Sequence, residues 1–182
     1  MMKHLPNILT LGRILAIPFL VAVFYWDTPW QNWILCTTFF FASITDFFDG
    51  YLARIYGTTS KLGQFLDPIA DKLMVAAILI MAVADGRIEG YHVIAALIIL
   101  LREIMVSGLR EFLSGQTVSV PVTFLAKWKT AFQMFALGAF LISTSAPFGL
   151  PAIEIGITCL WIAAIVTLYT GFDYLRAGLK HM

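Results

Sequence analysis

Long apolar runs alternate with short polar turns along this chain. Six runs occupy residues 9–25, 33–56, 68–84, 91–112, 122–145 and 152–177. Each is close to the length of about 17–25 residues with which an α-helix crosses a bilayer. The connections are too short to hold a separate soluble domain. The pattern therefore predicts an all-α integral membrane protein with a single domain over 1–182, a bundle of about six transmembrane helices.

Composition and charge agree with a membrane protein. The chain is 60% hydrophobic and 13% charged, with a mean hydropathy of +0.86, unlike an ordinary soluble domain. If the N-terminus faces the cytoplasm, six spans place every Lys and Arg except Arg87 on the cytoplasmic side. The positive-inside rule then predicts that both termini are cytoplasmic. The net charge of +1 gives no reason to expect a nucleic-acid partner.

Four carboxylates interrupt this apolar pattern between the second and third runs: Asp46, Asp49, Asp67 and Asp71. Spacings of three and four residues put each pair on one face of a helix. The segment between the pairs contains Gly57 and other turn residues, which favours an antiparallel hairpin with all four carboxylates facing one another. The dipeptide Asp67-Pro68 predicts the start of the third helix, with Asp as its cap and Pro in its first turn.

The energetic cost of this cluster calls for a positive charge beside it. A lone Asp at the centre of a membrane helix costs roughly 2.5–3.5 kcal/mol, so four would cost on the order of 10–14 kcal/mol. Carboxylate oxygens without His or Cys favour hard cations, and four Asp can hold two of them against a phosphate-bearing substrate. Helix capping and a proton or cation pathway are alternatives. The apolar outer halves of the second to fifth runs argue against a pathway through the bundle.

The acidic residues also belong to a longer motif. The pattern Asp46-x-x-Asp49-Gly50-x-x-Ala53-Arg54, followed after eight residues by Gly63-x-x-x-Asp67-x-x-x-Asp71, resembles the signature of the CDP-alcohol phosphatidyltransferases. The resemblance implies a polar active-site cavity facing the cytoplasm of a bacterial inner membrane, and a homodimer. It also implies that the four Asp bind two divalent cations, Mg²⁺ or Mn²⁺, and that Asp71 is the catalytic base.

The same resemblance assigns the nucleotide site. It implies that the cytidine nucleotide contacts Asn7, Thr10, Asp46, Asp49, Gly50, Ala53, Arg54 and Gly63. Asn7 and Thr10 belong to a shorter motif, Asn7-x-x-Thr10-x-x-Arg13, that precedes the first predicted span. For these two residues, local capping or hydrogen bonding between helices is an equally good reading.

Two further motifs concern the acceptor. Arg102-Glu103-x-x-x-Ser107-x-x-Arg110-Glu111 and Lys127-x-Lys129-Thr130 resemble those of family members that use sn-glycerol 3-phosphate. The implied reaction transfers the phosphatidyl group of CDP-diacylglycerol, drawn from the surrounding membrane lipids, to this acceptor and releases CMP. Arg110 and Lys127 are the expected ligands of the acceptor phosphate, with Arg102, which Glu103 could pair, as a further candidate.

Alternatives to this acceptor remain open. Serine, inositol phosphate and phosphatidylglycerol would use the same chemistry, and a membrane cation transporter is the alternative from another functional class. Some of the basic residues, including Lys129, could instead extend to the anionic lipid headgroups.

Overall fold

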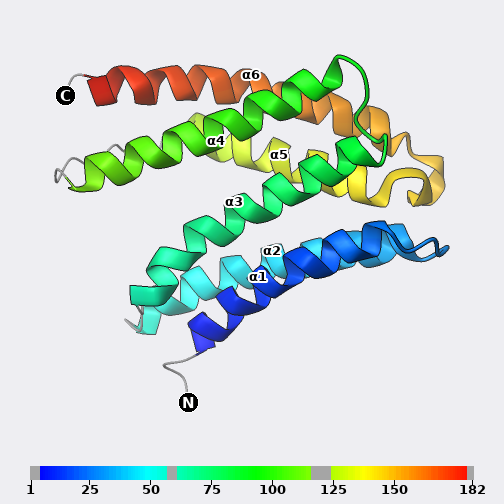
Figure 1. Cartoon of the computed structure of the whole chain (residues 1–182), viewed down its shortest axis with the longest axis horizontal. Coiled ribbons are helices and arrows are strands. Elements are labelled where there is room, and N and C mark those ends of the chain that lie inside the picture. The colour runs from blue at the N-terminus through cyan, green and yellow to red at the C-terminus, as the bar shows by residue number, and fades with distance from the viewer. Residues whose placement is uncertain (1–4, 57–60, 116–123, 180–182) are drawn as a thin grey trace. The chain divides into compact units, whose positions relative to one another are not determined.

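The computed structural model describes the backbone of residues 5–56, 61–115 and 124–179. It describes the side chains of 10–45, 65–109, 111–112, 125, 127–143 and 145–176. These parts of the chain form six α-helices and two short 3₁₀ turns (Figure 1). The elements are α1 (Leu5–Phe24), α2 (Gln31–Tyr56), α3 (Lys61–Ala84), α4 (His92–Gly115), α5 (Phe124–Ile142), η2 (Ser143–Ser145), η3 (Pro147–Gly149) and α6 (Ala152–Leu179).

Each predicted apolar run corresponds to one α-helix, so the all-α class and the six helices are confirmed. In the described part of the chain, two helical segments are long and apolar enough to cross a membrane, His92–Leu109 and Ala152–Arg176. Thr10–Phe24 is a shorter apolar segment. The crossing of a membrane by all six helices stays a prediction.

The predicted start of the third helix is wrong. Helix α3 begins at Lys61, and Pro68 lies inside it rather than in its first turn. Proline in a helix removes one backbone hydrogen bond and is unfavourable by about 3 kcal/mol. The preceding Lys, Leu and Gln are good helix formers, and Asp67 is held from another helix, as described below. The local start signal at Asp67-Pro68 is therefore overridden, and the helix begins earlier.

The chain divides into two compact units, each described here by itself. The first comprises Met1–Asp85 and Leu141–Leu150. In it, α1 packs against both α2 and α3, with a core that includes the buried side chains of Leu20, Leu35, Phe39 and Ile78. Asn32 Nδ2 donates a hydrogen bond of 3.0 Å to Ser145 Oγ, which ties η2 to α2. The prediction of a single domain stays a prediction.

The second unit comprises Gly86–Phe140 and Pro151–Met182. Helix α4 packs along α6, and buried alanines on both helices, such as Ala95 and Ala163, let their backbones approach closely. The ring of Phe140 in α5 covers Gly156 in α6, where an added Cβ would lie only 2.9 Å from a ring carbon. Arg87, which is buried, donates a hydrogen bond of 2.7 Å to the carbonyl oxygen of Phe140. This bond satisfies a carbonyl in the last turn of α5, where cations are favoured.

Candidate active site

The acidic motif lies on two helices of the first unit. Asp46 and Asp49 belong to the second half of α2, and Asp67 and Asp71 to the first half of α3. The helical spacing on which the sequence interpretation rests is thus present in the backbone. Five of the predicted nucleotide-site residues and the first acidic pair have side chains outside the described residues: Asn7, Asp46, Asp49, Gly50, Ala53, Arg54 and Gly63.

Asp67 is held by two residues of α1. The Thr10 hydroxyl donates a hydrogen bond of 2.6 Å to Asp67 Oδ1, and Arg13 Nη2 lies 3.6 Å from the same oxygen. Thr10 and Arg13 are three residues apart, so one face of α1 presents both to α3. A short hydrogen bond to a carboxylate and an adjacent guanidinium are among the strong polar interactions of proteins. They fix the position of the Asp67 carboxylate.

Burial differs sharply across this contact. The Arg13 side chain is only 4% exposed, whereas that of Asp67 is 48% exposed. Arg13 therefore approaches Asp67 from the protein side, and the carboxylate keeps an accessible side on which a ligand can bind. In the sequence, Arg13 is predicted only as the last residue of the motif Asn7-x-x-Thr10-x-x-Arg13. Its spacing of three residues from Thr10 is the signal that both side chains lie on one face of a helix.

Asp71 follows Asp67 by four residues on the same face of α3, and it is exposed. Together with Thr10, this pair offers only oxygen donors, which suit Mg²⁺ or Mn²⁺ better than zinc. Among the described side chains, no three His, Cys, Asp or Glu residues come together as a metal site. Because Asp46 and Asp49 are outside that set, the four-carboxylate centre stays a prediction.

Thr10 lies beside the acidic motif, and its hydroxyl forms a hydrogen bond between helices, to Asp67 of α3. Its role in nucleotide binding stays a prediction. A hydroxyl that orients a carboxylate from outside the motif is a supporting ligand of the kind that tunes metal sites.

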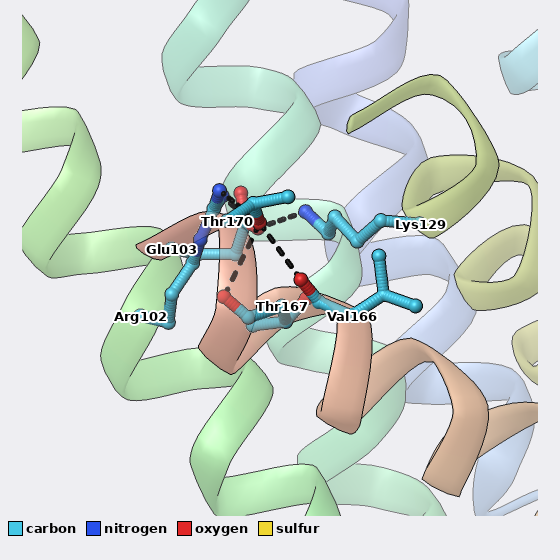
Figure 2. Close-up of polar contacts among 6 residues, drawn as sticks. All are labelled: Arg102, Glu103, Lys129, Val166, Thr167 and Thr170. Atoms are coloured by element: carbon cyan, nitrogen blue, oxygen red, sulfur yellow. Dashed lines mark hydrogen bonds and ion pairs between the residues drawn. The ribbon is translucent and has the colours of Figure 1, made fainter. Parts of the chain in front are cut away.

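The second unit contains a buried cluster of charged residues (Figure 2). Arg102 of α4 and Lys129 of α5 both form ion pairs with Glu103 Oε1, Arg102 at 3.3 Å. All three side chains are largely shielded from solvent, with 9% of Arg102, 7% of Lys129 and 18% of Glu103 exposed. The prediction that Glu103 pairs with Arg102 is confirmed. Lys129 is also held inside the protein by this pairing.

Helix α6 completes the cluster. Arg102 Nη2 donates a hydrogen bond of 3.0 Å to Thr170 Oγ1, and the Thr170 hydroxyl itself donates to the carbonyl oxygen of Val166. The guanidinium carbon of Arg102 also lies 5.7 Å from the centre of the Tyr174 ring, a favourable cation–π distance. Gly171 makes room for Arg102, because an added Cβ would lie 3.1 Å from Arg102 Cγ. Arg102 is thus bound on several sides by the protein.

The other two candidates for the acceptor phosphate differ from Arg102. Lys127 is exposed on α5, two residues from Lys129. The side chain of Arg110 lies outside the described residues. The structure therefore describes one accessible cation and one buried cation among the three candidates.

Comparison with known proteins decides the family. Residues 3–169 match the pattern of the family described as CDP-alcohol phosphatidyltransferase. The chain belongs to this family. The match covers most of the chain, and the acidic motif on α2 and α3 lies inside it.

Relatives within the family are similar over nearly their full length. The chain is 45% identical over 179 residues to the CDP-diacylglycerol–glycerol-3-phosphate 3-phosphatidyltransferase of Rickettsia bellii, covering 98% of this chain and 97% of the relative. It is 40% identical to the protein of the same name from Pectobacterium atrosepticum, covering 98% of this chain and 96% of that one.

A solved structure supports the fold. The phosphatidylinositol phosphate synthase of Mycobacterium tuberculosis, crystallised with manganese and citrate, is similar to this chain with a TM-score of 0.68 and 18% sequence identity. The similarity covers 97% of this chain and 81% of that one. At this level of identity the likeness concerns the arrangement of helices.

Proposed function

We propose that this protein transfers the phosphatidyl group of CDP-diacylglycerol to sn-glycerol 3-phosphate, giving phosphatidylglycerophosphate and CMP. The observation that carries the proposal is the identity of 45% over 98% of the chain to a relative named for this reaction. The acidic motif and the Thr10–Asp67 contact lie within the matched region and support the proposal.

The proposed cofactors are two divalent cations, Mg²⁺ or Mn²⁺, held by Asp46, Asp49, Asp67 and Asp71. The oxygen-only donors, the half-exposed Asp67 and the exposed Asp71 fit hard cations of this kind. Bound ions would orient the pyrophosphate and offset the charge that develops as CMP leaves.

In the proposed reaction, the acceptor hydroxyl oxygen forms a bond to the β-phosphorus of CDP-diacylglycerol. The bond from that phosphorus to the oxygen bridging to CMP breaks, and CMP takes the electron pair. Asp71 accepts the hydroxyl proton, while Thr10 and Arg13 keep Asp67 in position. Gly50, Ala53, Arg54, Gly63 and Asn7 are proposed to complete the nucleotide site.

The acceptor phosphate is proposed to bind Lys127 and Arg110, with Arg102 as the third candidate. The side chain of Lys127 is exposed, which supports its assignment as a ligand of the acceptor phosphate. Arg102 is the least accessible candidate, because Glu103, Thr170 and the Tyr174 ring already surround it. To contact the acceptor phosphate, Arg102 would have to lose one of these interactions.

The protein is further proposed to be a homodimer in a bacterial cytoplasmic membrane, with six spans and cytoplasmic termini. Large apolar side chains on the surface support the membrane location: Phe41 is 76% exposed, Ile104 70%, Phe135 69% and Phe172 66%. Such surfaces would be unfavourable in water and are suited to lipid.

The test is reconstitution of the purified protein with CDP-diacylglycerol, Mg²⁺ and labelled sn-glycerol 3-phosphate. The expected result is stoichiometric CMP release and label in phosphatidylglycerophosphate, both lost on chelation. CMP release that requires serine or inositol phosphate instead would overturn the acceptor. Folded protein that releases no CMP with any acceptor would overturn the reaction and favour the cation transporter.

A further inference from the structure

A groove of about 550 Å³ runs between α1 and α2 in the first unit, a volume typical of sites for small ligands. Its walls consist mainly of small and apolar residues. Helix α1 contributes Gly12, Arg13 and Ala16, and α2 contributes Phe41, Ala42 and three threonines.

Two of the three threonines that line the groove use their hydroxyl donors within their own helix. The Thr37 hydroxyl donates a hydrogen bond of 2.7 Å to the carbonyl oxygen of Trp33, and the Thr45 hydroxyl donates one of 2.7 Å to that of Phe41. Both donors are used within α2 itself. A ligand without hydrogen-bonding groups can therefore lie against this wall without leaving these donors unsatisfied.

One end of the groove is charged and adjoins the acidic motif. Arg13 lines the groove and lies 3.6 Å from Asp67. Thr45, which also lines the groove, directly precedes Asp46 in α2. The groove thus adjoins the motif at a polar end and is apolar along the rest. This arrangement suits a lipid whose headgroup lies at the motif and whose acyl chain lies in the groove.

We propose that this groove binds one acyl chain of CDP-diacylglycerol, and that Gly12 determines which chains fit. The proposal rests on the proposed function. Gly12 is exposed, and a Cβ added to it would meet nothing within 4 Å. A larger side chain at this position would therefore occupy groove space without a clash, and would exclude part of the acyl chain.

The test compares wild-type protein with Gly12→Leu on two substrates, dioleoyl and dihexanoyl CDP-diacylglycerol, in the same detergent. The expected result is a KM for the long-chain substrate raised by about tenfold, since excluding a few methylenes has effects of this size. The KM and kcat for the short-chain substrate stay unchanged. That selectivity separates a filled groove from general damage to the fold.

The matched control is Gly108→Leu in α4. Gly108 is also an exposed helical glycine whose added Cβ would meet nothing within 4 Å, and it does not line the groove. We expect no change of chain-length preference. Thr38→Leu, on the opposite wall of the groove, tests the proposal independently if Gly12→Leu does not fold, and is expected to shift the preference in the same direction.

Two results would overturn the proposal, and they differ from failure of the proposed function. Equal changes for both substrates, or none for either, in Gly12→Leu and Thr38→Leu would exclude the acyl chain from the groove while wild-type turnover stands. Wild-type protein that makes no phosphatidylglycerophosphate from either substrate would overturn the reaction itself.

Discussion

Replacing Glu103 by Gln tests the role of the buried charged cluster. The substitution preserves the size of the side chain, so it creates no cavity, but it removes the carboxylate that forms ion pairs with both Arg102 and Lys129. With 9% and 7% of these two side chains exposed, water cannot replace the lost carboxylate. The variant therefore removes the negative charge that these two buried cations share.

The magnitude follows from this burial. Removing one partner of a buried ion pair costs about 3–5 kcal/mol. The Gln amide can still accept one hydrogen bond, so we expect the lower end, about 3 kcal/mol. For a chain of this size, each kcal/mol lowers Tm by about 2–4 °C, which predicts a decrease of about 6–12 °C.

The assay is thermal unfolding of the purified protein in detergent, followed by tryptophan fluorescence and near-UV circular dichroism. Glu111→Gln is the matched control, because Glu111 is an exposed acid of the same helix and exposed pairs contribute less than about 1 kcal/mol. Adding Lys129→Met should recover part of the loss in Glu103→Gln, giving a coupling free energy of about 2 kcal/mol. Two results would refute the account of Glu103 as the counter-ion of two buried cations. One is a smaller decrease in Tm for Glu103→Gln than for Glu111→Gln. The other is strict additivity of the Glu103→Gln and Lys129→Met effects on stability.

Three further predictions concern the acidic site and helix packing. Asp71→Asn should lower kcat by about 10²–10⁴-fold, the range for loss of a general base, with unchanged Tm because Asp71 is exposed; near-normal CMP release would exclude the base role. Arg13→Gln should lower the apparent Mg²⁺ affinity by about 10–100-fold, as for other residues that orient a metal ligand; an unchanged Mg²⁺ titration would contradict it. Gly156→Ala should destabilise by about 1–3 kcal/mol through overpacking, since the added Cβ lies 2.9 Å from an aromatic ring. Gly108→Ala, which meets nothing within 4 Å, should keep or slightly raise Tm, so equal effects of the two substitutions would count against the packing argument.

The sequence by itself determined the helical class and the family. Apolar runs of spanning length predict helices because a chain in lipid must satisfy its backbone hydrogen bonds internally, and each run became one helix. The spacing of Asp46, Asp49, Asp67 and Asp71 needs only helical periodicity to define paired carboxylates. Their long motif pointed to the family that the comparison then showed.

Tertiary structure decided which residues support the site. Thr10 and Asp67 are 57 positions apart, and Lys129 and Glu103 are 26 apart, so no local pattern links them. The beginning of α3 at Lys61 was likewise missed, because its local signal at Pro68 was outweighed by the rest of the helix. Helical periodicity fixes which residues share a face, but the packing of α1 on α3, and of α5 and α6 beside α4, decides which faces meet. Contact energies between distant residues enter only at that stage, and they hold the Asp67 carboxylate in position and keep Glu103 between its two cations.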